Sequence, residues 1–305
     1  MDYDEGLRTL AREGASVFPG ALSNSAELLA YQRDLIWAAD TLAHGRVAEM
    51  PQVTDPAEAG ALLEASILRL RSQGSIVRHL QGLASQPAKL ASATQLRQCP
   101  NVLDLCISVF RGDRLRAGLE DGEPILAYPT MSDALTMFFA TEDDAGRPLH
   151  QSLPWHQDFP YMMQSSDQLV IWIPLTTYDE SLGGVECFPR SHLDGLVEQV
   201  GQGDYYEVAP SATARSAAHS DGPVRLPWNL GDVAMFHGFL QHRTIPNTNS
   251  DRVRVIQTFR VSDLSRGSGL EYNFRSTGYV DRNYEDPKNL DFRDQYPRLM
   301  ILGEA

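Results

Sequence analysis

The chain has 305 residues, and its 26 Lys and Arg against 40 Asp and Glu give a formal net charge of −14. Such an acidic chain lacks the basic surface of a nucleic-acid-binding protein and would be repelled by an anionic membrane. With 42% hydrophobic and 22% charged residues, extensive disorder is not expected. The three cysteines have no CxxC spacing and fit neither a disulfide framework nor a zinc ribbon. An acidic amino-terminal segment and the lack of a long apolar run predict a soluble, cytoplasmic protein.

The first third of the chain has apolar residues at helical spacing. Asn24, three residues before Glu27, has the pattern of a capping box and predicts the start of one helix. Asp55 followed by Pro56 predicts the start of a second helix. A third is expected over residues 77–83.

Beyond about residue 99 the pattern changes to short apolar runs separated by Gly, Pro, Asp and Asn, which predicts strands. The expected strands are residues 104–110, 134–140, 169–175, 185–188, 233–236 and 254–261. Helices followed by strands indicate an α+β fold. We therefore expect one domain over residues 1–305, with a helical flank (1–98), a β core (99–264) and a carboxyl-terminal extension (265–305).

A histidine and an aspartate lie two residues apart at His156 and Asp158. In an extended strand such residues point to one side, so they can offer an imidazole and a carboxylate to one metal ion. Two histidines and one carboxylate form the facial triad that holds Fe(II) and leaves three positions open. His237 and His242 are the candidates for the second imidazole, although an HxD pair alone is a weak signal.

Two arginines, Arg252 and Arg254, lie at the start of the last predicted strand. A buried arginine is costly unless an anion meets it, and a guanidinium can hold a carboxylate with two parallel hydrogen bonds. A dicarboxylate ligand would therefore fit. Because the two arginines are two residues apart, they share a face and periodicity cannot separate them.

Several motifs together carry a resemblance: WHQD at 155–158, VIWIPL at 170–175, GG at 183–184, PRSH at 189–192, GD at 231–232 and HRTIPN at 242–247. Over roughly residues 154–261 the chain resembles the phytanoyl-CoA dioxygenase family. The resemblance implies an oxygenase dependent on Fe(II) and on 2-oxoglutarate as co-substrate. The implied core is a double-stranded β-helix (jelly-roll, cupin-like) with a helical amino-terminal flank.

Carried over to this chain, the resemblance implies catalytic metal ligands at His156, Asp158 and His242, and 2-oxoglutarate contacts at Arg254, Thr244 and Trp172. His242 is preferred to His237 because the family's ligand stands just before a Ser/Thr-x-Pro-Asn turn. The segment between that turn and the strand is one residue longer than usual, so Arg252 stays an alternative to Arg254.

The expected reaction is hydroxylation of an unactivated C–H bond of a small molecule by O₂, with release of succinate and CO₂. The carboxylate of Asp158 argues for hydroxylation over halogenation, whereas desaturation, ring closure and epoxidation stay open. An acidic loop at 142–144 is a candidate lid for a cationic substrate. Two alternatives remain, a cupin-like metalloenzyme without 2-oxoglutarate and a non-catalytic binding module. The sequence gives no prediction of oligomeric state.

Overall fold

The computed structural model describes residues 3–73, 83, 90–116, 125–129, 134–140, 153–161, 165, 167–202 and 205–264. Two features expected from the sequence, the acidic loop at 142–144 and the extension at 265–305, lie outside these residues. The helix expected at 77–83 also lies outside them except for residue 83.

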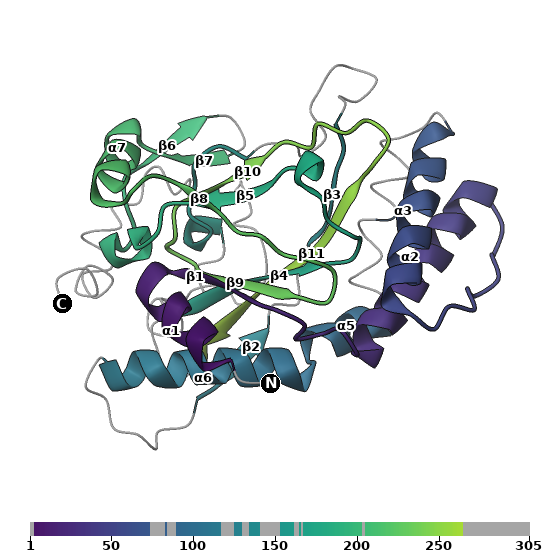
Figure 1. The fold of residues 1–305 in the computed structure, drawn as a ribbon, viewed down its shortest axis with the longest axis horizontal. Helices are drawn as coiled ribbons and strands as arrows, with labels where there is room; N and C mark the ends of the chain where they lie inside the picture. Colours follow the sequence, from purple (N-terminus) through teal and green to yellow (C-terminus); the bar gives the residue numbers. More distant parts are fainter. Residues whose placement is uncertain are drawn as a thin grey trace.

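Helices surround a set of antiparallel sheets (Figure 1). The helices are α1 (Asp4–Glu13), α2 (Ala26–His44), α3 (Pro56–Ser72), α5 (Ala91–Arg97), α6 (Pro100–Arg116) and α7 (Pro210–His219). The strands are β1 (Ala15–Phe18), β2 (Ala127–Pro129), β3 (Ala134–Phe138), β4 (Gln168–Pro174), β5 (Gly184–Cys187), β6 (Gln199–Gln202), β7 (Tyr205–Val208), β8 (Val224–Arg225), β9 (Val233–His237), β10 (His242–Ile245) and β11 (Arg254–Asp263). Within the described residues, no helix is long and apolar enough to cross a membrane.

The main sheet has the strand order β1-β9-β4-β11-β2, and β3 also pairs with β11. A smaller sheet has the order β10-β5-β8, and β6 pairs with β7. The expected mixture of helices and antiparallel strands is thus confirmed, and five of the expected strands match β3, β4, β5, β9 and β11 to within two residues. β1 was missed, so the expected helical flank supplies an edge strand of the main sheet.

The strand expected at residues 104–110 is wrong, because α6 occupies that segment. Counted from the first buried residue of α6, the other buried residues lie three, four, seven and eight positions later. This is the spacing of residues on one face of a helix. They are Val102, Leu105, Cys106, Val109 and Phe110. A short apolar run has the same composition in a buried helix and in a buried strand, and only its surroundings separate the two.

The start of α2 is one residue away from the expected position. Ser25, not Asn24, caps this helix, since its Oγ accepts a hydrogen bond from the Leu28 N–H at 3.1 Å. The expected start of α3 is confirmed: the Asp55 carboxylate accepts from the Glu58 N–H at 2.9 Å. In both helices a side-chain oxygen satisfies an amide that has no partner inside the helix.

The two faces of the main sheet have different neighbours. One face, which includes Ile171 and Val255, packs in a core shared with the helices. The opposite face, which includes Trp172 and Ile256, packs against the smaller sheet through Cys187. Because both faces of β4 are covered, all seven of its residues are buried, which accounts for its continuous apolar run. The inner face, between the two sheets, is where the expected site residues lie.

Candidate active site

His156 and His242 face each other in an isolated antiparallel pair. The N–H of each donates to the carbonyl oxygen of the other, at 2.9 and 3.0 Å, and their ring centroids are 4.1 Å apart. The Asp158 Oδ1 lies 3.4 Å from His156 Nε2 and 3.8 Å from His242 Nε2. All three side chains are buried, and their ligand atoms lie within 4.8 Å of one another. The fold therefore brings together the three residues expected to hold the metal.

The orientation of both imidazoles is fixed by the backbone. The sequence predicted a regular strand at His156 and Asp158, but the structure has none there. Instead, a single β-bridge at His156 precedes a short 3-10 helix. The Nδ1 of His156 is 2.7 Å from the Pro154 carbonyl oxygen, and that of His242 is 3.0 Å from the Leu240 carbonyl oxygen. A carbonyl can only accept, so each Nδ1 carries a proton, and in a neutral imidazole the lone pair is then on Nε2, where a metal can bind.

Asp158 also contacts a cation that the sequence analysis did not identify. Arg260 donates to Asp158 Oδ2 from Nε at 3.1 Å and from a terminal nitrogen as well. Burial alone would raise the pKa of Asp158, but the charge of Arg260 holds it well below its usual range. Asp158 is therefore ionised, with Oδ2 held by Arg260 and Oδ1 turned toward the imidazoles.

His242 and His237 differ in their surroundings. Burial, with the nearby His156, lowers the pKa of His242 to about 3, so its imidazole is neutral, the form that binds metals. His237 is not part of the group that His156 and Asp158 form. Its Nδ1 accepts from the Phe239 N–H at 3.2 Å, and its ring lies 5.5 Å from that of His192. The geometry thus supports His242 over His237.

The two arginines at the start of β11 have opposite environments. Arg252 donates from Nε to Glu64 at 2.6 Å and from Nη1 to Asp179 at 2.9 Å. Arg254 is 2% exposed, and its three guanidinium nitrogens have no hydrogen-bond partner in the described part of the chain. Burial lowers the pKa of Arg254 to about 9, so it is still cationic at neutral pH. Arg252 is thus already neutralised, whereas Arg254 can accept an anion.

The Arg254 guanidinium lies over the ring of Phe138, and Tyr178 interacts with it electrostatically. Trp172 packs against Phe138, and Trp228 packs against Tyr178. We call Phe138, Trp172, Tyr178 and Trp228 the aromatic cup. The guanidinium carbon lies 3.9 Å from the centroid of the Phe138 ring. Trp172, on β4, contacts both Phe138 and Trp228, with centroid distances of 6.5 and 5.6 Å. An apolar wall of this kind excludes water and strengthens any charge pairing at the arginine.

Thr244 is buried on β10, two residues beyond His242, and pairs with Val185 of β5. Residues two apart on a strand share a face, so Thr244 and His242 both turn toward the inner core.

Sequence reasoning missed Arg260, Tyr178 and Trp228. Arg260 could have been predicted from strand periodicity, because it lies six residues (260 − 254) beyond Arg254 on β11 and so shares its face. No sequence pattern indicates Trp228, because its position depends on packing against Trp172, which is distant in the sequence.

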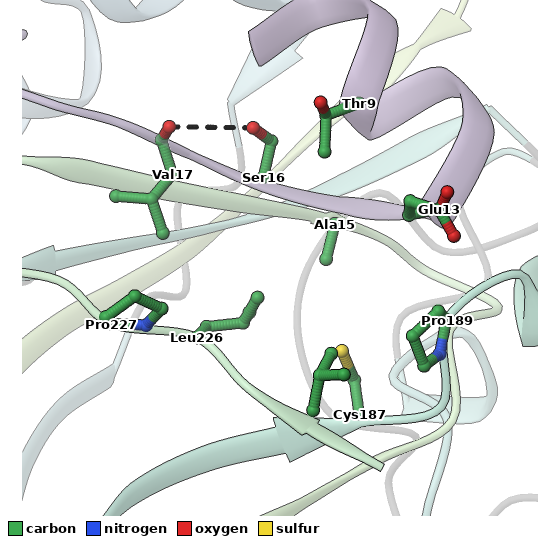
Figure 2. Close-up of a pocket in the computed structure, with 10 residues that line it drawn as sticks. Thr9, Glu13, Ala15, Ser16, Val17, Cys187, Pro189, Leu226 and Pro227 are labelled. Atoms are coloured by element: carbon green, nitrogen blue, oxygen red, sulfur yellow. Dashed lines mark hydrogen bonds between the residues drawn. The ribbon is translucent and has the colours of Figure 1, made fainter. Parts of the chain in front are cut away.

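A separate cavity of about 420 Å³ lies between α1, β1 and the smaller sheet. Figure 2 shows its lining, in which Ala15 and Val17 lie across from Cys187 and Leu226. None of the six expected site residues lines it. Cys187 connects the two regions, because it pairs with His242 in the smaller sheet.

Comparison with known proteins gives a family and distant relatives. The family model of phytanoyl-CoA dioxygenase (PhyH) matches residues 73–255, more than half of the chain. A 1-deoxypentalenic acid 11-beta-hydroxylase of Streptomyces arenae is 27% identical over 154 residues, which are 49% of this chain and 53% of that protein. The chain spans about half the length of the curated relatives it matches.

Solved structures share the fold at low sequence identity. The epimerase SnoN, in complex with Fe³⁺, alpha ketoglutarate and nogalamycin RO, has a TM-score of 0.54 and 17% identity, covering 85% of this chain and 83% of that one. EctD from S. alaskensis, with 2-oxoglutarate and 5-hydroxyectoine, has a TM-score of 0.51 and 16% identity, covering 87% and 77%.

Proposed function

The chain belongs to the phytanoyl-CoA dioxygenase family, and on this premise we propose that it is an Fe(II)- and 2-oxoglutarate-dependent dioxygenase. The proposed reaction is hydroxylation of an unactivated C–H bond in a small-molecule substrate. The observation that carries the proposal is the pairing of a buried His-Asp-His group with a buried arginine that has no partner among the described residues.

The donor set fits iron. Two imidazoles and one carboxylate are the ligands of the facial triad, and here His156, Asp158 and His242 would supply them. Arg260 holds the second carboxylate oxygen of Asp158, which favours attachment to the metal through one oxygen. All three side chains are buried, so an ion that they hold would be shielded from bulk water.

The chemistry of the residues around Arg254 suits 2-oxoglutarate. Arg254 would hold the distal carboxylate with two parallel hydrogen bonds, which would satisfy a guanidinium that is otherwise unpaired among the described residues. Trp172 would pack beside the carbon chain of the co-substrate, and Thr244 would assist Arg254. When bound, iron and 2-oxoglutarate supply the oxidation of the C–H bond by O₂, with release of succinate and CO₂.

We assign the core to the double-stranded β-helix (jelly-roll) class, with residues 1–305 as one domain. Support comes from two antiparallel sheets that pack face to face through a shared apolar core. SnoN and EctD, which share the fold, also support it.

The proposed function predicts succinate release that needs both Fe(II) and O₂. The purified protein is incubated with Fe(II), 2-oxoglutarate and air, with and without a panel of small carboxylic acids, terpenoids and polyketides. We expect slow succinate formation alone and faster formation with a substrate. Succinate formation that is unchanged when iron is removed by a chelator would contradict the proposal.

A cupin-like enzyme without 2-oxoglutarate is distinguished by the same assay. Such an enzyme would bind a metal at the triad and convert its substrate, yet it would form no succinate.

A further inference from the structure

Two indole nitrogens in the aromatic cup are buried. The Nε1 atoms of Trp172 and Trp228 have no hydrogen-bond partner in the residues that the structure describes, and Trp228 is 1% exposed. An indole N–H can only donate, and a buried tryptophan usually finds an acceptor. Together with the guanidinium of Arg254, the residues of the aromatic cup and its arginine thus hold several buried donors that the described residues leave unpaired, and an acceptor-rich ligand would satisfy them.

A row of rings runs from the metal ligands to the cup. The ring of His242 lies 4.7 Å from Phe236, Phe236 lies 5.7 Å from Trp172, and Trp172 lies 5.6 Å from Trp228. Trp172 therefore links Phe236, which contacts a metal ligand, to Trp228.

Trp228 is connected to Arg254 through Tyr178. Its ring lies 5.9 Å from that of Tyr178, which interacts electrostatically with Arg254. A Cβ placed on Gly184 would lie 3.5 Å from the Tyr178 hydroxyl and 3.9 Å from Arg254 Nη1, so these two groups approach the same point. The absence of a side chain at Gly184 leaves room there.

We propose that the Trp228 indole N–H binds the distal carboxylate of 2-oxoglutarate beside Arg254. Trp228 thereby selects a 2-oxo acid with a second carboxylate over one without it. This inference rests on the proposed function. A carboxylate has about four acceptor sites, so two bonds from a guanidinium leave room for a further N–H donor. Trp172, which contacts Phe236 beside His242, then lies beside the carbon chain.

A structural role is the competing explanation for Trp228. Its ring meets that of Trp172 at 68°, an edge-to-face contact in which one N–H can point at a ring. The two explanations differ in the ligand they affect. A packing role would change the binding of every 2-oxo acid alike, whereas a carboxylate contact changes only that of the dicarboxylate.

The test compares two ligands on Trp228→Phe, which keeps a ring and removes the N–H. The Fe(II)-loaded enzyme is titrated calorimetrically, without oxygen, with 2-oxoglutarate and with pyruvate, which lacks the distal carboxylate. We expect the Kd for 2-oxoglutarate to rise about 10- to 100-fold, as for a lost hydrogen bond to a charged group, and that for pyruvate to change less than about threefold. Trp37→Phe is the matched control, because Trp37 Nε1 donates to the Ala48 carbonyl oxygen at 3.0 Å.

A second measurement uses the wild-type chain and needs no folded variant of Trp228. The four tryptophans give four indole N–H signals in a ¹H–¹⁵N spectrum of the zinc-loaded, ¹⁵N-labelled protein, and substitution of the other three assigns that of Trp228. We expect 2-oxoglutarate to shift the Trp228 signal downfield and pyruvate to leave it in place.

The outcomes separate this inference from the proposed function. If the wild type prefers 2-oxoglutarate to pyruvate but Trp228→Phe loses none of that preference, the inference is wrong and the proposed function stands. Equal weakening of both ligands also overturns the inference, in favour of packing. If the wild type binds no 2-oxoglutarate, the proposed function itself fails.

Discussion

Replacing Arg254 with methionine is expected to stabilise the protein without 2-oxoglutarate and to remove most of its affinity for that co-substrate. The guanidinium is buried without a hydrogen-bond partner among the described residues, and such a charge costs free energy. Methionine keeps an unbranched apolar stem. We expect the free energy of unfolding to rise by about 1–2 kcal/mol, since the loss of the cation–π contact with Phe138 offsets part of the gain.

The affinity of Arg254→Met for 2-oxoglutarate should fall, although its stability rises. Truncating one partner of a buried charge pair costs about 2–5 kcal/mol, so the Kd for 2-oxoglutarate should rise by roughly 100-fold or more. Chemical denaturation of the metal-free protein measures the first effect, and anaerobic calorimetry of the Fe(II)-loaded protein measures the second. Gain of stability together with loss of binding is typical of a site where function conflicts with folding.

Arg252→Met is the matched control, and we expect it to lower the stability of the protein without weakening the binding of 2-oxoglutarate. Its removal leaves the buried carboxylate of Glu64 and the carboxylate of Asp179 without their cation. The free energy of unfolding should fall by about 1–3 kcal/mol, while the Kd for 2-oxoglutarate stays within about threefold. If Arg254→Met bound 2-oxoglutarate normally and Arg252→Met bound it weakly, Arg252 and not Arg254 would be the residue that holds the co-substrate.

Asp158→Asn is expected to lower the affinity for Fe(II) at least about 100-fold. The substitution keeps the size of the side chain and removes the one negative charge in the triad. It also leaves Arg260 without its carboxylate partner, so the metal-free protein should lose about 1–3 kcal/mol of unfolding free energy. Anaerobic titration with Fe(II), followed calorimetrically, checks the first effect.

Two control variants test whether the effect belongs to the triad. Glu186→Gln removes a carboxylate from β5 that pairs with Arg243. His237→Asn removes the histidine that was the alternative ligand and keeps an acceptor for the Phe239 N–H. Both should bind Fe(II) within about threefold of the wild type. If Asp158→Asn bound Fe(II) as tightly as the wild type, or if His237→Asn lost its affinity for Fe(II), the metal would not be held by the proposed triad.

Much of the β core follows from local sequence pattern. β4 and β11 are apolar runs bounded by turn residues, and both become central strands covered on both sides. α6 was mistaken for a strand because its apolar residues cluster over a short window, and burial against the other helices decides its form. The cap of α2 shifted from Asn24 to Ser25 because both residue types cap helices well.

The candidate site was predictable where its residues lie in motifs and not where they depend on distant contacts. The spacing of His156 and Asp158 made them candidates, and the family resemblance, with its Ser/Thr-x-Pro-Asn turn, favoured His242 as the third ligand. Periodicity could not choose between Arg252 and Arg254, because the choice depends on Glu64, 188 residues away from Arg252 in the sequence. That glutamate lies on α3, and no local pattern links it to β11.

The most direct test of the account is the visible spectrum of the protein under strict exclusion of oxygen. Fe(II) is added first and 2-oxoglutarate second, and the absorbance is recorded at each step. We expect a weak metal-to-ligand charge-transfer band that appears only with both present, since 2-oxoglutarate would bind to iron held by His156, Asp158 and His242. If iron binds but no band develops when 2-oxoglutarate is added, the assignment as a 2-oxoglutarate-dependent oxygenase is contradicted.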